Sequence, residues 1–277
     1  MRRALVVLIL ITALAPAAAQ QFTPAPGDDP LHRPLDEILD ANVRDGLVYY
    51  RALKSARGRL DHYTASLNVP PATYAGWSKP QQMAFWVDAY NAFVLETVID
   101  HYPIHGSAQA APSNSIRQIP GAFEKTTWRA AGRAVTLDAI ENTILPEFNE
   151  PRLYLALGRG ALGSGRLRSE AYTAERLDKQ LADIQAEFVT NRLMLSIDRA
   201  NNTMVVSPII SWHDQAFIAA YQTTDPTFAT RSPIERAIVA FILPSLLPLE
   251  QEFVQQNRFK VTFGTMDWHL NDLTGRS

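Results

Sequence analysis

The longest periodic apolar pattern in the chain covers Gln81–Tyr102 and predicts a helix that begins after Ser78 and ends before Pro103. At about 100° per residue, one arc of this helix collects the apolar residues Val87, Tyr90, Val94, Leu95 and Val98. Asp88 and Asn91 fall within the same arc. An unpaired polar group there would cost about 1 to 3 kcal/mol, so we expect both side chains to have partners. They either form a structural network or line a cleft.

The remaining periodic segments predict several helices and fewer, shorter strands. Helices are expected over residues 60–67, 137–145, 174–193 and 232–243. Strands are expected over residues 47–50, within 123–135, and over 152–157, 204–208 and 259–263. Because helices outnumber strands and the two do not alternate regularly, the pattern indicates an α+β fold, in which a single helix-rich domain packs on a small, mostly antiparallel sheet.

The N-terminal pattern differs from the rest and is typical of a secretory signal over residues 1–19. A pair of arginines precedes the apolar stretch Leu5–Leu14, and small residues follow at Ala17–Ala19. Thr12 and Pro16 interrupt the apolar run, which is shorter than the roughly 18 residues of a membrane anchor. We therefore expect a protein that is exported to the periplasm or the extracellular space and has no membrane anchor.

Composition narrows the function classes further. Residues 20–34 are rich in proline, glycine and aspartate and predict a flexible lead, followed by a single globular domain over 35–277. The chain contains no cysteine, which excludes disulfides, thiolate metal ligands and thiol nucleophiles. Its formal net charge is −2, and no run of lysine and arginine follows the N-terminal segment. Nucleic acid is therefore not expected as a partner.

A glycine-rich segment, Gly158–Gly163, formally matches the dinucleotide fingerprint G-x-G-x-x-G. In that motif the last glycine opens a helix whose N-terminus faces the pyrophosphate. Here the residues 164–173 intervene before the next expected helix. The segment therefore does not predict dinucleotide binding, and no cofactor is expected.

Ser164 lies between two glycines, a setting in which a hydroxyl acts as a nucleophile if a histidine reaches it. The six histidines of the chain form no H-E-x-x-H or similar motif, so no metal site is expected. Histidine and aspartate are close in sequence at His213-Asp214 and at Asp267-Trp268-His269. On a strand Asp267 and His269 would share a face, although most such pairs form simple hydrogen bonds.

Several motifs resemble, in order and spacing, the domain of unknown function 547 family, an uncharacterised group common in exported bacterial proteins. The resemblance extends from about Asp61 to Asp272. The motifs that carry it are Ala84–Ala92 with Asp100–Pro103, Ser115–Arg117, Leu137–Glu141, Pro151–Leu157, Glu170–Thr173, Ser207–Ile209 with Trp212, and Asp267–Asp272. The resemblance implies that the chain keeps the family's fold and its polar residues.

Four positions, at three places in the chain, depart from the family pattern. Family members usually have a histidine where this chain has Tyr154, an Asn-Cys pair where it has Gly158-Arg159, and a second cysteine where it has Ser164. By analogy with papain-like enzymes, the cysteine and histidine of the family suggest a cysteine hydrolase. If that is the family's chemistry, this chain has lost both groups.

Two functions therefore remain open. The first is a non-catalytic member that binds an unknown small molecule, peptide or envelope protein. The second is a hydrolase with Ser164 as nucleophile in a papain-like cleft, whose base would be His101, His213 or His269. We favour the first, because the nucleophile and its partners act as a unit and all are replaced. The residues expected to bind a ligand or to structure the cleft are Asp88, Asn91, Arg117, Glu141, Arg152, Tyr154 and His269.

Overall fold

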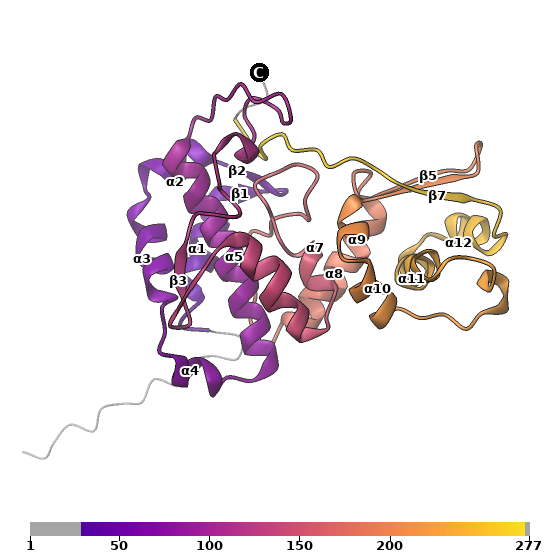
Figure 1. Ribbon diagram of the computed structural model, residues 1–277, viewed down its shortest axis with the longest axis horizontal. Coiled ribbons are helices and arrows are strands. Elements are labelled where there is room, and N and C mark those ends of the chain that lie inside the picture. Colours follow the sequence, from indigo (N-terminus) through magenta and orange to yellow (C-terminus); the bar gives the residue numbers. More distant parts are fainter. Residues whose placement is uncertain (1–28, 275–277) are drawn as a thin grey trace, which may run out of the picture.

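The computed structural model describes residues 29–274, whose path is drawn in colour in Figure 1. The expected signal peptide over 1–19, and the expected lead up to residue 28, lie outside the described residues. The first helix, α1, covers Arg33–Asn42 and so takes in the last two residues of the expected lead. Its apolar residues, Leu35 among them, are buried in the core.

Helices make up most of the ordered elements. The longer ones are α1, α3 (Gly58–Ser66), α5 (Lys79–His101), α8 (Leu177–Thr190), α11 (Pro233–Ile242) and α12 (Pro248–Gln255). The shorter ones are α2 (Tyr50–Ser55), α4 (Pro71–Ala75), α6 (Leu137–Ala139), α7 (Arg152–Leu155), α9 (Pro208–Trp212) and α10 (Asp214–Ala220). Between them, within residues 29–274, lie the π-helical turn η2 (Ile140–Ile144) and four 3₁₀ turns, which are η1 (Ile116–Gln118), η3 (Leu145–Phe148), η4 (Pro226–Phe228) and η5 (Leu243–Ser245).

The strands form three small sheets within the described residues. Two are antiparallel pairs, β1 (Val43–Arg44) with β2 (Leu47–Val48) and β3 (Trp128–Ala130) with β4 (Arg133–Val135). The third has the order β5-β6-β7, with strands Leu195–Asp198, Thr203–Val206 and Lys260–Phe263. Its first pair is antiparallel and its second is parallel. The fold is therefore α+β with small, mostly antiparallel sheets, as the pattern predicted.

Helix α5 is the centre of the N-terminal half of the molecule (Figure 1). A capping box starts it, because the Ser78 side chain accepts from the backbone of Gln81 and the Gln81 side chain accepts from the backbone of Ser78. Elements α2, α3, α6 and η3 pack against it, so that every residue over 84–99 is buried except Glu96. None of the described helices, α5 included, combines the length and apolar character needed to span a membrane.

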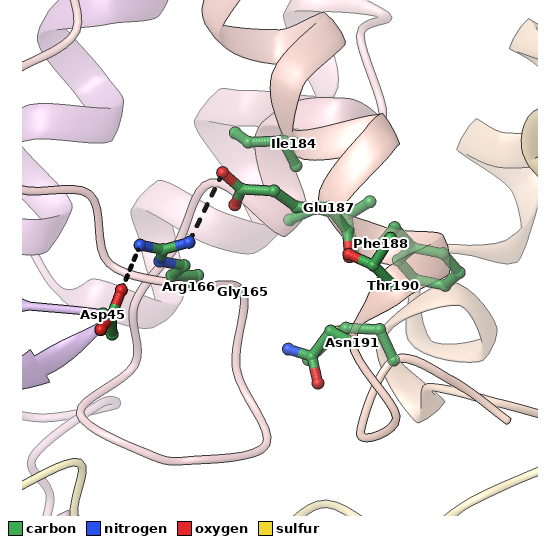
Figure 2. A pocket seen from close by; sticks show the side chains of 10 residues that line it. Asp45, Gly165, Arg166, Ile184, Glu187, Phe188, Thr190 and Asn191 are labelled. Carbon is green, nitrogen blue, oxygen red and sulfur yellow. Dashed lines mark hydrogen bonds and ion pairs between the residues drawn. The ribbon is translucent and has the colours of Figure 1, made fainter. Parts of the chain in front are cut away.

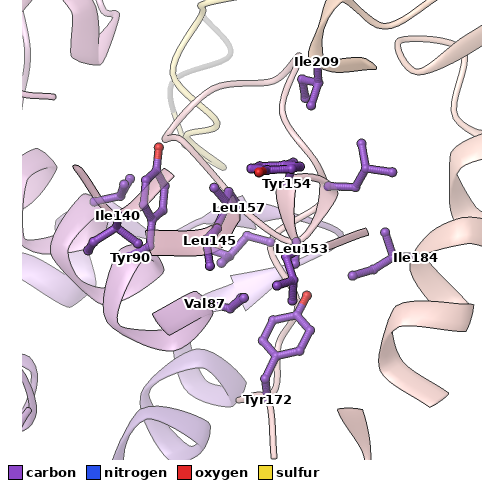
Figure 3. Close-up of a cluster of buried hydrophobic side chains, with 14 of the residues drawn as sticks. Val87, Tyr90, Ile140, Leu145, Leu153, Tyr154, Leu157, Tyr172, Ile184 and Ile209 are labelled. Carbon is purple, nitrogen blue, oxygen red and sulfur yellow. The ribbon is translucent and has the colours of Figure 1, made fainter. Parts of the chain in front are cut away.

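A buried apolar cluster connects α5 to the elements that follow it (Figure 3). Val87 of α5, Leu153 of α7 and Ile184 of α8 are three of its members, and all three are at most 6% exposed. The short helix α7 lies inside this cluster. Its position matters for the site, because the glycine-rich loop, residues 158–165, follows shortly after its end.

The expected strand over residues 152–157 was wrong. Pro151 has helical backbone angles and starts α7. A short, continuous apolar run fits a buried helical turn as well as a buried strand, so periodicity could not distinguish them. The expected strand over 47–50 is shorter for a related reason, because Tyr50 already begins α2.

The C-terminal segment 264–274, which we term the C-terminal strap, runs from β7 back to the N-terminal half (Figure 1, yellow). It pairs first with the glycine-rich loop, through hydrogen bonds from the backbone N–H groups of Leu162 and Gly163. It then pairs with β2, where Val48 bonds to both Asn271 and Leu273. The C-terminal strap therefore connects the glycine-rich loop to β2, because its backbone bonds to both.

Candidate functional site

A buried polar cluster forms where the π-helical turn η2 meets the glycine-rich loop. Its centre is the carboxylate of Glu141, to which Arg159 donates from Nη2 at 2.5 Å and from Nε at 3.2 Å. Tyr90 donates its O–H to Oε2 at 3.0 Å, and His213 donates Nε2–H to Oε1 at 3.0 Å. Together with Tyr154, these four residues are termed the Glu141 cluster. A π turn inside a helix is often found at functional sites, and here it carries the central carboxylate.

Arg159 is almost completely enclosed, with 1% of its surface exposed. Its Nη1 donates to the backbone oxygens of Tyr154 and Leu157, at 3.1 and 3.2 Å. The Tyr154 ring stacks on the His213 ring with 3.6 Å between centroids and 3° between planes. The guanidinium therefore has acceptors on two sides, and the imidazole is held between a carboxylate and a phenol ring.

The charges in this cluster stabilise one another. Burial alone would raise the pKa of Glu141, but the charge of Arg159 and the hydrogen bonds from His213 and Arg159 lower it to about 2. Burial alone would lower the pKa of Arg159, but the Glu141 carboxylate raises it. Burial and the Glu141 charge raise the pKa of Tyr154 to about 12. At neutral pH the cluster thus contains the charged ion pair of Glu141 and Arg159, and the phenols of Tyr90 and Tyr154 are neutral.

Asn91 of α5 fixes the start of the loop that carries Arg159. Its Oδ1 accepts from the backbone N–H of Gly158 at 2.8 Å, and its Nδ2 donates to the backbone oxygen of Ala156 at 3.1 Å. Arg159 itself has a φ of 29°, in the left-handed region that costs a non-glycine residue about 1 to 3 kcal/mol. The amide of Asn91 and the ion pair to Glu141 hold this backbone in place from both sides.

A solvent-facing surface lies next to the Glu141 cluster, and we term Trp212, Trp268 and Arg117 the tryptophan surface. The two indole rings are stacked, with centroids 6.3 Å apart and planes at 15°, and Trp212 is 45% exposed. The Arg117 guanidinium lies 4.4 Å from the ring centroids of both Trp268 and Phe123. The buried Arg159 lies 5.9 Å from the Trp212 ring. The surface is therefore in contact with the buried cluster.

Asp88 belongs to a different environment, on the side of α5 that faces α1 and α3. Its Oδ1 accepts from the backbone N–H of Tyr172 at 3.0 Å, and its Oδ2 lies 3.2 Å from Nδ1 of His32. The same His32 nitrogen makes its hydrogen bond with the Tyr63 hydroxyl at 2.7 Å. Burial raises the pKa of Asp88 well above its usual value and lowers the pKa of His32 to about 4. Asp88 and Asn91 thus support separate parts of the fold.

Ser164 is buried, with 2% of its surface exposed, and its hydroxyl has no hydrogen-bond partner within residues 29–274. In the same range, His101 bonds to a backbone oxygen, His213 to Glu141 and His269 to Asp267. None of the described histidines bonds to a serine or threonine hydroxyl. The structure therefore places no base at Ser164.

Arg152 and His269 lie in ion pairs outside the Glu141 cluster. Arg152 binds Glu150 through two nitrogens, at 2.9 and 2.7 Å, at the start of α7. His269 binds Asp267 at 2.7 Å on the C-terminal strap and is largely exposed. Of the seven residues expected to bind or to structure a cleft, the structure brings Glu141 and Tyr154 into one cluster. Arg117 lies on the adjoining surface, Asn91 supports the loop, and the rest lie elsewhere.

Sequence reasoning missed the roles of Arg159, His213, Trp212 and His32. Arg159 was visible only as a departure from the family pattern, and nothing local showed that its charge would be buried. His213 was considered only as a base and next to Asp214, whereas its partner, Glu141, is 72 residues away. A glutamate in an apolar helical segment, such as Glu141, is the signal that should have prompted a search for a buried cation.

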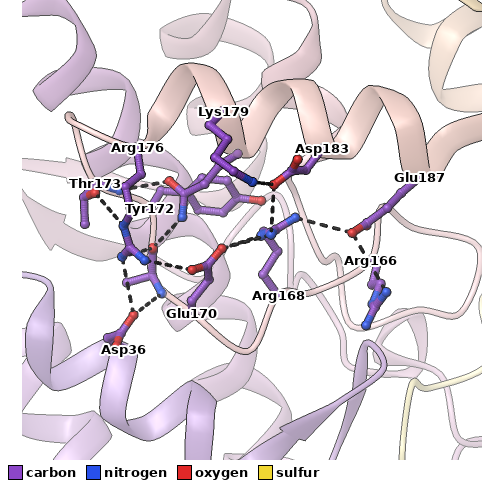
Figure 4. A network of polar contacts seen from close by, with 12 residues as sticks. Asp36, Arg166, Arg168, Glu170, Tyr172, Thr173, Arg176, Lys179, Asp183 and Glu187 are labelled. Atoms are coloured by element: carbon purple, nitrogen blue, oxygen red, sulfur yellow. Dashed lines mark hydrogen bonds and ion pairs between the residues drawn. The ribbon is translucent and has the colours of Figure 1, made fainter. Parts of the chain in front are cut away.

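The donor types present do not suggest a metal site. The Glu141 cluster holds one carboxylate and one imidazole, and the carboxylate already binds a guanidinium. Across the described part of the chain, no group of three or more histidine, aspartate or glutamate side chains is placed to hold a metal ion. Other polar contacts, such as the network of arginines and carboxylates around α8 in Figure 4, consist of ion pairs.

Comparison with known proteins gives one match. Residues 74–189 match the model of a family described as a protein of unknown function, DUF547. This region contains α5, the π-helical turn and the glycine-rich loop, and thus most of the Glu141 cluster. Neither the curated proteins nor the solved structures contain a match to the chain.

Proposed function

The chain belongs to the DUF547 family through residues 74–189, and we propose that it is an exported, non-catalytic member that binds a ring-bearing ligand on the tryptophan surface. Export is supported by the arginine pair, the short apolar stretch and the small residues over 1–19. The two other parts of the proposal, absence of catalysis and binding, have separate support.

The non-catalytic assignment rests on one observation, the burial and pairing of Arg159. The resemblance places a cysteine at this position in other members, whereas here a buried guanidinium occupies it. The guanidinium is bound by Glu141 and by two backbone oxygens. A group that is fully charged and fully bonded is neither a nucleophile nor a base. The position at which the resemblance places a cysteine therefore offers neither a nucleophile nor a base in this chain.

We expect that a fluorophosphonate probe for reactive serines will not label the protein at Ser164. The hydroxyl is buried and lacks a base, so it is not activated. The measurement compares labelling of the wild type with that of Ser164→Ala at equal concentration, with an active serine hydrolase as positive control. Labelling that disappears in Ser164→Ala would overturn the non-catalytic assignment.

Binding is supported by the chemistry of the tryptophan surface. An exposed indole offers a flat apolar face, and Trp and Arg are the residues most often found at the centre of binding surfaces. Arg117 keeps Trp268 in place through its cation–π contact, and Arg159 lies beneath Trp212. Rings of sugars, prolines or aromatic groups stack on such a face. The contacts of Arg117 and Arg159 therefore hold the two indole rings in place before a ligand binds.

The binding test uses tryptophan fluorescence with two sets of probes, N-acetylglucosamine oligomers and proline-rich peptides. We expect saturable binding of one set, weakened at least tenfold in Trp212→Ala because central tryptophans contribute about 2 kcal/mol or more. Phe263→Ala is the matched control, since Phe263 is 40% exposed on β7 and outside the surface. Equal weakening in both variants, or no saturable binding by either set, would contradict the assignment of this surface.

A further inference from the structure

A hollow lies between the end of the glycine-rich loop and α8 (Figure 2). Its volume is about 240 Å³, and its wall contains the apolar side chains of Leu155, Ile184, Phe188 and Met194. None of its lining residues belongs to the Glu141 cluster or to the tryptophan surface. The hollow is therefore a separate candidate site, and we term it the α8 pocket.

The charged residues of the α8 pocket are two carboxylates and one guanidinium. Arg166 lies between Asp45 and Glu187, at 2.9 and 3.9 Å, as Figure 2 shows. Asp45 belongs to the turn between β1 and β2, and its side chain is 91% exposed. The Arg166 guanidinium is thus already paired on two sides. The pocket lining contains one more carboxylate than it contains guanidinium groups. Glu187 also lies 3.4 Å from Nη1 of Arg168. A ligand anion would have to displace a carboxylate from Arg166, whereas a ligand cation can approach the exposed side of Asp45 without displacing one.

The surroundings of the pocket also carry a net negative charge. A polar hollow next to it shares Arg166 and Glu187, and its lining includes Asp36, Arg168, Glu170 and Arg176, which Figure 4 also draws. Across both hollows, three guanidinium groups face five carboxylates, which are Asp36, Asp40, Asp45, Glu170 and Glu187. The formal charge of the two linings together is −2. This charge favours the approach of cations and disfavours that of anions.

We propose that the α8 pocket binds a small organic cation, with its apolar body against Ile184 and Phe188 and its ammonium group at Asp45 and Glu187. The pocket, at about 240 Å³, has room for a small organic ligand. An apolar wall with a few charged groups at one end is the usual composition of a small-molecule site. The inference does not depend on the function proposed for the tryptophan surface.

The test compares hexylamine, hexan-1-ol and hexanoate, which share an apolar chain and differ in charge. Each is titrated into the ¹⁵N-labelled protein, and backbone shifts are followed by NMR. We expect hexylamine to shift the amides of residues 165–166 and 184–194 in a saturable way, hexan-1-ol to bind more weakly, and hexanoate to bind weakest. The tryptophan surface is monitored in the same spectra, so the two sites are distinguished.

Two variants give the charge dependence. Asp45→Asn removes one carboxylate at a left-handed position that asparagine also adopts, so the fold is retained. It should weaken hexylamine binding by up to about fivefold, the range for an exposed ion pair, and strengthen hexanoate binding at the released Arg166. Asp40→Asn is the matched control, because Asp40 lines only the neighbouring hollow. Its effect should be smaller.

Three results would overturn the proposal. The first is binding of hexanoate as tight as that of hexylamine. The second is the absence of saturable shifts with hexylamine, and the third is saturable shifts confined to residues outside the pocket. Unchanged hexylamine affinity in Asp45→Asn would remove the assigned role of that carboxylate, and with it the charge argument.

Discussion

The Glu141→Ala variant is expected to lose about 3 to 5 kcal/mol of its free energy of unfolding. The substitution leaves the Arg159 guanidinium buried without its counter-charge, and it also removes the acceptor of Tyr90 and His213. Breaking a buried ion pair from one side is costly because the remaining charge keeps its desolvation penalty. Urea unfolding followed by circular dichroism measures the loss.

A double-mutant cycle separates the ion pair from the other contacts of Glu141. In Arg159→Met the charge is removed and the apolar stem is kept, so Glu141→Ala should cost much less in that background. Glu124→Ala is the surface control, because its partner is Arg117 and its side chain is 54% exposed. That control should lose no more than about 1 kcal/mol. Additive losses in the cycle would show that Glu141 and Arg159 are not coupled.

The central helix and its polar positions were predictable because their signals are local. The run of apolar residues, the serine before it and the proline after it fixed α5 to within two residues. The cost of burying Asn91 required a partner, and the structure shows two backbone partners in the loop at 156–158. The sequence could not show which loop would be chosen, since that depends on the three-dimensional path of the chain.

The rest of the site could not be predicted because its contacts join distant segments. Glu141 and His213 lie 72 residues apart in the sequence. The backbone bonds between the glycine-rich loop and the C-terminal strap also join distant residues, Leu162 to His269 and Gly163 to Asp267. Arg159 was visible as a substitution, but its burial depends on the Glu141 carboxylate that neutralises it. Likewise, His32 lies in the segment expected as a flexible lead, and the structure buries it between Tyr63 and Asp88.

The pair His32 and Asp88 should hold one proton over a wide pH range. Burial lowers the pKa of His32 to about 4 and raises the pKa of Asp88 well above its usual value. Above about pH 4, up to the raised pKa of Asp88, the folded pair therefore keeps its proton on Asp88, whereas the unfolded chain keeps it on His32 below about pH 6.5. Both states bind one proton, so the pair adds no pH dependence to the free energy of unfolding in this window.

Single substitutions should reveal the opposing contributions of His32 and Asp88 to the pH dependence of the free energy of unfolding. In Asp88→Asn only His32 titrates, and its lowered pKa means that stability is lost as the pH falls from about 6.5 to 4, by about 3 kcal/mol. In His32→Gln only Asp88 titrates, and its raised pKa means that stability is lost as the pH rises above about 4.

The measurement that separates these contributions is urea unfolding at half-unit steps of pH, compared as slopes between the variants and the wild type. The titration of Glu141 is common to all of them and cancels in the comparison. The double variant, in which neither group titrates, should regain the wild-type slope between about pH 4 and 6.5. If Asp88→Asn itself keeps that slope, the proton of the folded pair does not reside on Asp88, and the lead segment is not anchored by a neutral imidazole.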